Sequence, residues 1–391
     1  MLEGFSTLEK AGGMAGGLAL IALVVVVMSR RFKLARMPTT SDVIAGRDLS
    51  GLHVVITGAN TGLGFETARA LAGANASVVL ACRSSQRGAD AKARILAEFP
   101  KADVAMHVLD LSDLQTIRPF ADALAPGRPI DVLVLNAGIF PKTACRSAQQ
   151  LESTFACNHL GHFGVCRALE PLFAPAGARV VTVSSVSHGD QPGGLGWSTL
   201  GRRGYGTASD ESPWRLNTAL QTYAQSKLCN VLFACELARR ASHLISVSVH
   251  PGVAVPTDIF NADREQPGMG LVMRVLATAL KLFQRSVPQG AATTVHAAIG
   301  ADVVSGTYLA DCAVAKASAT SQSLEEAAKL WCLSDRLLEA YHAGEANLLN
   351  PLLSFVSTSI QAPLSDAESR PVPLREPLLR AAARDRTAVE D

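Results

Sequence analysis

The chain is poor in aromatic residues, nearly neutral in charge and without closely paired cysteines. Of its 391 residues, 5% are aromatic and 48% are apolar, a balance that suits a core of Ala, Val and Leu side chains. The formal net charge of +2 gives no strong basic field, so we expect no nucleic-acid partner. The length suffices for one large α/β domain with appended segments.

The eight cysteines include no CxxC pair and no Cys/His cluster with zinc spacing, so we predict no metal site. His159 and His162 lie on either side of Gly161. No third ligand is evident for them, and we assign both to helix packing. Scattered cysteines of this kind are typical of buried, reduced thiols in a cytosolic compartment.

An uncharged apolar run covers residues 11–28. At roughly 1.5 Å per residue it just spans a hydrocarbon core of about 30 Å, and we predict a transmembrane anchor over 11–29. The basic residues follow the run, which by the positive-inside rule leaves the rest of the chain cytosolic and argues against a cleaved signal peptide. They are Arg30, Arg31, Lys33 and Arg36. GxxxG spacing within the run permits a homodimer.

Short apolar runs then alternate with longer amphipathic stretches. This alternation predicts a single Rossmann-type, doubly wound α/β domain at 51–345, with a parallel sheet of about seven strands. The expected strands are Leu52–Thr57, Ser77–Cys82, Val104–Leu109, Ile130–Asn136, Ala178–Ser184, Ile245–His250 and Thr307–Leu309. The expected helices are Leu63–Gly73, Gln86–Phe99, Leu114–Leu124, Gln149–Leu172, Ala219–Ala241, Gln289–Ile299 and Leu324–Tyr341.

Segments of other character flank this domain. Residues 1–10 are a short N-terminal segment, and 30–50 read as a basic flank and linker. Residues 346–391 are predicted to be a largely disordered tail. Its apolar part, Leu348–Ile360, either touches a bilayer or packs on the domain.

Two long irregular stretches, 188–217 and 253–287, each follow a strand end. Long loops at the carboxyl ends of strands commonly surround a ligand, so we assign both to a substrate-binding mouth. Their aromatic residues Trp197, Trp214 and Phe260 either line an apolar pocket or pin the loops.

A glycine-rich turn, Thr57-Gly-Ala-Asn-Thr-Gly-Leu-Gly64, follows the first expected strand. Glycines let the backbone turn tightly and approach phosphate oxygens, and the helix that starts here favours anions at its N-terminus. The TGxxxGxG spacing differs from the GxGxxG of two-domain dehydrogenases. The turn predicts a dinucleotide site that includes Gly58, Asn60, Gly62, Leu63 and Gly64.

The end of the second strand indicates which dinucleotide binds. NAD-selective folds place an acidic residue there to accept from the ribose hydroxyls, whereas this chain has Arg83. A guanidinium can pair bidentately with a 2′-phosphate, so we predict NADP(H). The other expected cofactor residues follow later strands, and they are Asp110, Leu111, Asn136, Ala137, Gly138, Pro251 and Gly252.

Tyr223 and Lys227 are one turn apart on an expected helix and share a face. A phenol has an unperturbed pKa of about 10, and a neighbouring ammonium lowers that pKa by stabilising the phenolate. Ser185 ends the fifth strand, where it can hydrogen-bond a substrate oxygen, and Asn158 can hold a water that leads to Lys227. Together they indicate proton transfer coupled to hydride chemistry on a carbonyl or an alcohol.

The motifs TGANTGLG, ACR, LDLS, LNAG, NHLGHF, VTVSSVSH, YAQSK and HPG follow one another between about Leu52 and Leu309. In these motifs the chain resembles short-chain dehydrogenases/reductases of the classical type, and in particular their membrane-anchored, NADP-preferring retinol dehydrogenase branch. The resemblance implies a membrane of the endoplasmic reticulum or a related organelle.

The resemblance also implies a catalytic tetrad. Tyr223 would be the general acid/base, and Ser185 would orient and polarise the carbonyl. Lys227 would bind the nicotinamide ribose and tune Tyr223, which would also contact the cofactor. Asn158 would complete a proton relay.

Two departures from the family pattern concern the pocket. The interval between Ser185 and Tyr223 is longer than the family usually shows, and its insert GGLGWSTLGRRGYG should remodel the mouth. After Pro251-Gly252, Pro256 stands where the family expects a threonine, and Thr257 comes one residue later, which puts that cofactor contact in doubt.

The sequence therefore favours a membrane-anchored, NADP(H)-dependent oxidoreductase acting on a lipophilic carbonyl or alcohol, such as a retinoid, sterol or fatty aldehyde. Two alternatives stay open. One is C=C reduction of the protochlorophyllide type, and the other is a non-catalytic NADP-binding scaffold.

The cofactor preference can be tested with Arg83→Ala. The change should raise the KM for NADPH far more than the KM for NADH, because only NADPH carries the 2′-phosphate. Steady-state kinetics with both cofactors would measure the difference, and equal effects on both would contradict the preference for NADP(H).

Overall fold

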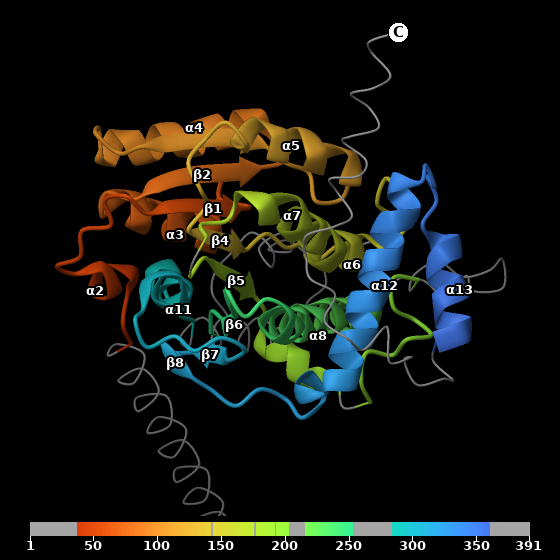
Figure 1. Cartoon of the computed structure of the whole chain (residues 1–391). Helices are drawn as coiled ribbons and strands as arrows, with labels where there is room; N and C mark the ends of the chain where they lie inside the picture. The colour runs from red at the N-terminus through yellow and green to blue at the C-terminus, as the bar shows by residue number, and fades with distance from the viewer. Residues whose placement is uncertain are drawn as a thin grey trace, which may run out of the picture.

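The computed structural model describes residues 37–141, 144–175, 177–191, 193–202, 216–252 and 284–359. Within them, one sheet has the strand order β3-β2-β1-β4-β5-β6-β7-β8 (Figure 1). The strands are β1 His53–Thr57, β2 Ser77–Cys82, β3 Val104–Val108, β4 Val132–Leu135, β5 Arg179–Val183, β6 Ile245–His250, β7 Tyr308–Ala310 and β8 Ala313–Val314. The first seven pair in parallel, which confirms the expected sheet. The short β8, antiparallel to β7, was not expected.

The α-helices are α2 Thr40–Ile44, α3 Gly62–Gly73, α4 Ser85–Glu98, α5 Ile117–Leu124, α6 Ser153–Phe155, α7 Gly161–Leu169, α8 Leu216–Arg240, α11 Val287–Ile299, α12 Leu324–His342 and α13 Leu349–Ser359. Shorter helical turns are η1 Leu114–Thr116, η2 Ala156–Leu160, η3 Glu170–Leu172, η4 Val186–Asp190 and η5 Thr320–Gln322.

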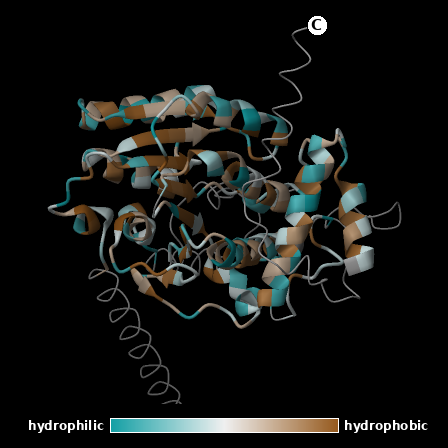
Figure 2. Cartoon of the chain, viewed as in Figure 1, coloured by the Kyte–Doolittle hydropathy of each residue, from teal (hydrophilic) through white to brown (hydrophobic). Residues whose placement is uncertain are grey.

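Alternating strand residues enter two separate cores, one on each face of the sheet. In β1, Val54 and Ile56 pack in the core with α3, α4 and α11, whereas Val55 packs in the core with α5, α7 and α8. Because both faces are covered, the central strands β1 and β4 are buried along their whole length, and β4 is entirely apolar. Figure 2 shows them as brown ribbons between helices of mixed colour.

Helices α12 and α13 form a further layer outside α7 and α8. Trp331 of α12 lies between Phe163 of α7, at 4.9 Å between ring centroids, and Phe233 of α8, at 6.0 Å. Leu352 and Phe355 of α13 are buried against this layer. Figure 1 shows α12 and α13 side by side.

Described structure continues past residue 345, where the domain was expected to end. Helix α13 falls in the segment expected to be a largely disordered tail, yet its apolar side chains complete the core that α12 begins. Of the two alternatives for Leu348–Ile360, packing on the domain is the one observed for 348–359. Residues 360–391 lie outside the described residues.

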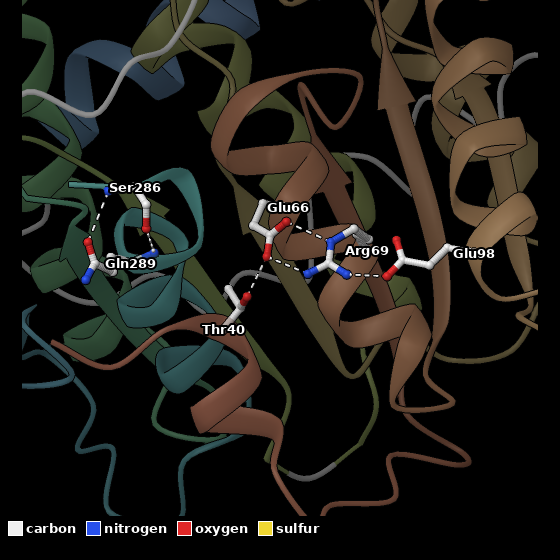
Figure 3. A network of polar contacts seen from close by, with 6 residues as sticks. All are labelled: Thr40, Glu66, Arg69, Glu98, Ser286 and Gln289. Atoms are coloured by element: carbon white, nitrogen blue, oxygen red, sulfur yellow. Dashed lines mark hydrogen bonds and ion pairs between the residues drawn. The ribbon is translucent and has the colours of Figure 1, made fainter. Parts of the chain in front are cut away.

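The expected linker at 30–50 also contains ordered structure. Thr39 and Asp42 form a capping box that starts α2. Thr40 is buried and donates to Glu66 Oε1 of α3 at 2.5 Å. Glu66 in turn pairs with Arg69, which reaches Glu98 of α4 at 2.7 Å (Figure 3). This network fixes the chain before β1 against the domain.

The single helix expected over Gln149–Leu172 is divided. It begins at Ser153, passes through the π-helical turn η2, continues as α7 and ends in the 3₁₀ turn η3, where Pro171 interrupts the α-helical bonding. A π turn inserts one extra residue and often marks a functional site. Here it contains Asn158.

The predicted anchor at 11–29 lies outside the described residues. Among the helices of the described part, none has the length and apolar character to cross a membrane.

The contribution of α12 to stability can be tested with Trp331→Ala. The change should lower the free energy of unfolding by about 3–5 kcal/mol, because it removes a buried aromatic side chain that joins α7, α8 and α12. Urea unfolding of the full chain measures the loss. Leu324→Ala on the same helix is the control, since Leu324 is 65% exposed. Equal, small losses for both variants would show that α12 is only loosely attached.

Candidate active site

The predicted site residues gather at one edge of the sheet, because the neighbouring strands β1, β4, β5 and β6 run in parallel and end together. The glycine turn follows β1, Asn136-Ala137-Gly138 follow β4, Ser185 follows β5 and Pro251-Gly252 follow β6. The sheet order changes direction between β1 and β4, which is where open α/β sheets form their ligand crevice.

The glycine turn requires glycine at three positions. Gly58 and Gly62 have φ values of +65° and +58°, which favour glycine. A Cβ atom on Gly64 would lie only 2.3 Å from Asn136 Nδ2 and 2.5 Å from Gly58 O. Helix α3 starts here, so its first N–H groups are available as donors for an anion. Asn60 and Leu63, in the same turn, are half-buried. The turn therefore fits a dinucleotide pyrophosphate.

The ends of β1 and β4 are joined by hydrogen bonds. Thr57 Oγ1 accepts from the backbone N–H groups of Asn136, at 2.9 Å, and Ala137, at 3.0 Å. Asn136 Nδ2 donates to Thr57 O at 2.9 Å. Gly138 follows directly, and a Cβ there would contact Lys227 Nζ at 3.4 Å. The turn after β4 thus lies between the glycine turn and the proton-transfer residues.

Ser185, Tyr223 and Lys227 lie together at the end of β5. The hydroxyl groups of Ser185 and Tyr223 are hydrogen-bonded, and Phe140 packs edge-on against the Tyr223 ring at 5.5 Å. Lys227 Nζ is 5.5 Å from the centroid of that ring and donates to Val183 O at 3.1 Å. Helix α8 is fixed to β5 by Ser184 Oγ, which donates to Lys227 O at 2.7 Å.

Burial perturbs both titratable groups. It raises the pKa of Tyr223 to about 12, although the hydrogen bond with Ser185 acts in the opposite direction. Burial lowers the pKa of Lys227 to about 8. Each shift favours the neutral form, because the charged form loses its hydration. The pair can therefore hold or release one proton within an enclosed site.

Asn158 is fully buried in η2, where three hydrogen bonds hold its side chain. Its Oδ1 accepts from Ile139 N at 2.8 Å, while its Nδ2 donates to Ile139 O at 3.1 Å and to Ser226 Oγ at 3.0 Å. Both amide hydrogens are thus used within the protein. The side chain fastens the turn after β4 to α8, and one Oδ1 lone pair remains for a water.

The residues expected on the adenosine side of the site follow strands β2 and β3. Arg83 is exposed directly after β2, and no ion pair of its guanidinium occurs within the part of the chain that the structure describes. Asp110 Oδ1 accepts from Ser112 N at 2.9 Å and Ser112 Oγ at 2.6 Å. Leu111 is buried and contacts Gly161 through its backbone. Arg83 and Asp110 follow the ends of β2 and β3, which are neighbours in the sheet.

The residues after β6 contact an arginine that the sequence analysis did not identify. Gly252 has a φ of +99°, and a Cβ there would lie 2.2 Å from the Arg285 side chain. Arg285 donates to Pro251 O at 3.4 Å and pairs with Asp311 at 2.5 Å. No sequence motif signals this contact, because Arg285 comes far downstream of Gly252. Pro256, Thr257 and Phe260 lie outside the described residues.

The described part of the insert, 193–202, is held by helices. Trp197 Nε1 donates to both carboxylate oxygens of Glu326 in α12 at 3.1 Å. Gln225 of α8 donates to Leu195 O at 2.7 Å. Trp197 therefore pins the loop, which is one of the two roles considered for it, and Trp214 lies outside the described residues.

Comparison with known proteins agrees with this geometry. The family model for short chain dehydrogenases matches residues 52–197. The WW domain-containing oxidoreductase of Gallus gallus is 41% identical over 311 residues, which cover 77% of this chain and 71% of that protein. The chain belongs to the short-chain dehydrogenase family.

Other relatives of this short-chain dehydrogenase include retinol dehydrogenase 12 of Homo sapiens. That protein is 36% identical over 296 residues, covering 74% of this chain and 87% of the relative. Among solved structures, an uncharacterised protein from Mycobacterium paratuberculosis is 31% identical, with a TM-score of 0.58, and covers 78% of this chain and 98% of its own. Membership of the family implies a nicotinamide cofactor, and the glycine turn described above fits one.

Lys227→Met should stabilise the cofactor-free protein while removing any activity. With a folded pKa of about 8 against an ordinary 10.5, Lys227 destabilises the fold most below pH 8, and the effect disappears as the pH rises through 10.5. The gain at pH 7 should reach roughly 3 kcal/mol. Val183 O keeps a donor in the variant, because Asn230 Nδ2 also reaches it at 3.0 Å.

Urea unfolding of the full chain at pH 7 and pH 10 would measure this difference. Lys101→Met is the control, because Lys101 is exposed and its replacement should leave the free energy of unfolding nearly unaltered. A Lys227→Met variant that is less stable than the original protein at both pH values would contradict the assigned burial effect.

Proposed function

We propose that this short-chain dehydrogenase is an NADP(H)-dependent oxidoreductase that interconverts a lipophilic alcohol and its carbonyl compound. The observation that carries the proposal is the hydrogen bond between Ser185 and Tyr223, with the buried amino group of Lys227 beside the Tyr223 ring. The Tyr223 phenol therefore has the surroundings that a general acid requires.

Hydride transfer to or from the carbonyl carbon is the chemistry that the nicotinamide supplies when bound. The protein supplies the proton. In reduction, Tyr223 donates its hydroxyl proton to the substrate oxygen, while the Ser185 hydroxyl hydrogen-bonds the same oxygen and holds it in place. The protonated Lys227 stabilises the phenolate left behind. In oxidation, the same phenolate accepts the proton of the alcohol.

The position of Arg83 supports NADP(H). The guanidinium is exposed at the end of β2, where an acidic residue would select NAD. Within the described residues it has no carboxylate partner, so it is available to a 2′-phosphate.

A lipophilic substrate is supported by two observations. Phe140 packs against Tyr223 and so provides an apolar wall next to the proposed acid. The relatives at 36% identity include retinol dehydrogenases 11 and 12 of Homo sapiens, whose names specify an apolar alcohol. A membrane anchor at 11–29, with the enzyme domain on the cytosolic side, would bring the site close to substrates dissolved in lipid.

The substrate class can be tested by screening the detergent-solubilised full chain with NADPH against apolar aldehydes, ketones and enones. We expect NADPH oxidation with aldehydes or ketones. Turnover of enones alone would point to C=C reduction, and binding of NADPH without any turnover would point to a scaffold.

Tyr223→Phe should lower kcat by about 10²–10⁴-fold, the usual contribution of a positioned general acid. The Kd for NADPH should change little, because the ring and its packing are kept. Tyr341→Phe on α12 is the control and should leave kcat unchanged. Steady-state kinetics and NADPH fluorescence titration measure both quantities, and a Tyr223→Phe enzyme with full activity would exclude this mechanism.

A further inference from the structure

Two histidines in the segment 156–169 have similar burial but different partners. His159 and His162 are both almost fully buried, and burial lowers the pKa of each to about 3. His159 hydrogen-bonds Ser334 of α12 at 2.8 Å and packs among aromatic rings. It belongs to helix packing, as the sequence analysis expected. His162 instead contacts two residues of the candidate active site.

The partners of His162 determine which ring nitrogen carries hydrogen. Nδ1 lies 3.0 Å from the carbonyl oxygen of Asn158, which can only accept. Nδ1 is therefore the protonated nitrogen. In the neutral ring Nε2 is then an acceptor, and its neighbour at 2.9 Å is Thr57 Oγ1.

Thr57 fits this assignment. Its Oγ1 already accepts from the N–H groups of Asn136 and Ala137, so its own hydrogen is free to be donated. The alternative acceptor, Val134 O, is more distant, at 3.4 Å. One directional chain results, in which two backbone amides donate to Thr57, Thr57 donates to His162, and His162 donates to Asn158.

We propose that His162 is a positioning residue that couples the cofactor-binding turn to the proton-transfer group. On one side it holds the end of β1, against which Asn136 and Ala137 are hydrogen-bonded. On the other it holds the π turn that places Asn158 against Ile139 and Ser226. Ser226 adjoins Lys227 in α8. The inference rests on the proposed function, because it assigns His162 to the geometry of that same site.

Two substitutions separate the two hydrogen bonds. In His162→Asn, the amide replaces the Nδ1 end and keeps a donor for Asn158 O, but it is too short to reach Thr57. In His162→Gln, the amide replaces the Nε2 end and keeps an acceptor for Thr57. His159→Gln is the matched control, since it alters an equally buried histidine in the same segment that faces α12.

The readouts are the Kd for NADPH, from nicotinamide fluorescence, and kcat with the best carbonyl substrate, both on the full chain in detergent. His162→Asn should raise the Kd about tenfold, as expected for one lost hydrogen bond, with a smaller effect on kcat. His162→Gln should lower kcat about tenfold with little change in Kd. His159→Gln should lower only the thermal midpoint.

The proposal would be overturned if both His162 variants behaved like His159→Gln, with a lower thermal midpoint but unchanged Kd and kcat. That result would show that His162 only supports packing. Failure of the proposed function has a different signature, because the original protein would then turn over no carbonyl substrate. The NADPH Kd series would still test the contact with Thr57.

A second measurement applies even if the variants do not fold. In nitrogen NMR of the ¹⁵N-histidine-labelled protein, His162 should be neutral and protonated at Nδ1 between pH 6 and 8, and the directional chain requires this state. A ring that is charged, or protonated at Nε2, would overturn the proposal.

Discussion

The site is organised around the buried amino group of Lys227, which has no carboxylate partner among the residues that the structure describes. Lys227 Nζ is buried. Within the described residues it donates a hydrogen bond to the neutral backbone carbonyl of Val183. Removing an ammonium from water is unfavourable, and the lowered pKa expresses this cost. The same lack of a paired anion leaves the positive charge available to a phenolate on Tyr223. The burial of Lys227 therefore accounts both for its destabilising effect on the fold and for its proposed action on Tyr223.

The surrounding structure holds this unfavourable group in place with ordinary interactions. Strand β5 supplies Val183 O, and Ser184 fastens the α8 backbone to the same strand. Asn158 ties α8 to the turn after β4 through Ser226 and Ile139. Ser184 reaches a backbone carbonyl of α8, whereas Asn158 reaches the backbone of Ile139 and the hydroxyl of Ser226. Strand ends and one long helix thereby define the geometry of the reacting groups.

The C-terminal part of the chain stabilises the face of the sheet that carries α8. Trp331 joins α12 to α7 and α8, and Glu326 holds the insert through Trp197. Arg285 and Asp311 brace the residues after β6. The elements that border the expected substrate mouth are thus fixed by contacts with segments distant in the sequence.

Local patterns in the sequence determined the parallel sheet, the glycine turn and the pairing of Tyr223 with Lys227, because strand periodicity, positive φ values and helical spacing are properties of neighbouring residues. Sequence patterns did not reveal α13 as part of the domain, the π turn at Asn158, or the roles of Arg285 and His162. Each of these depends on partners brought close only by folding. The apolar residues at 348–356 could not be assigned to the domain from sequence, because the surface of α12 that they contact forms only on folding. Likewise, a histidine in a helix is taken as a packing residue when its two hydrogen-bond partners are not known. Whether His162 takes part in the site was decided by tertiary structure, since only the fold sets Thr57 and Asn158 on either side of its ring.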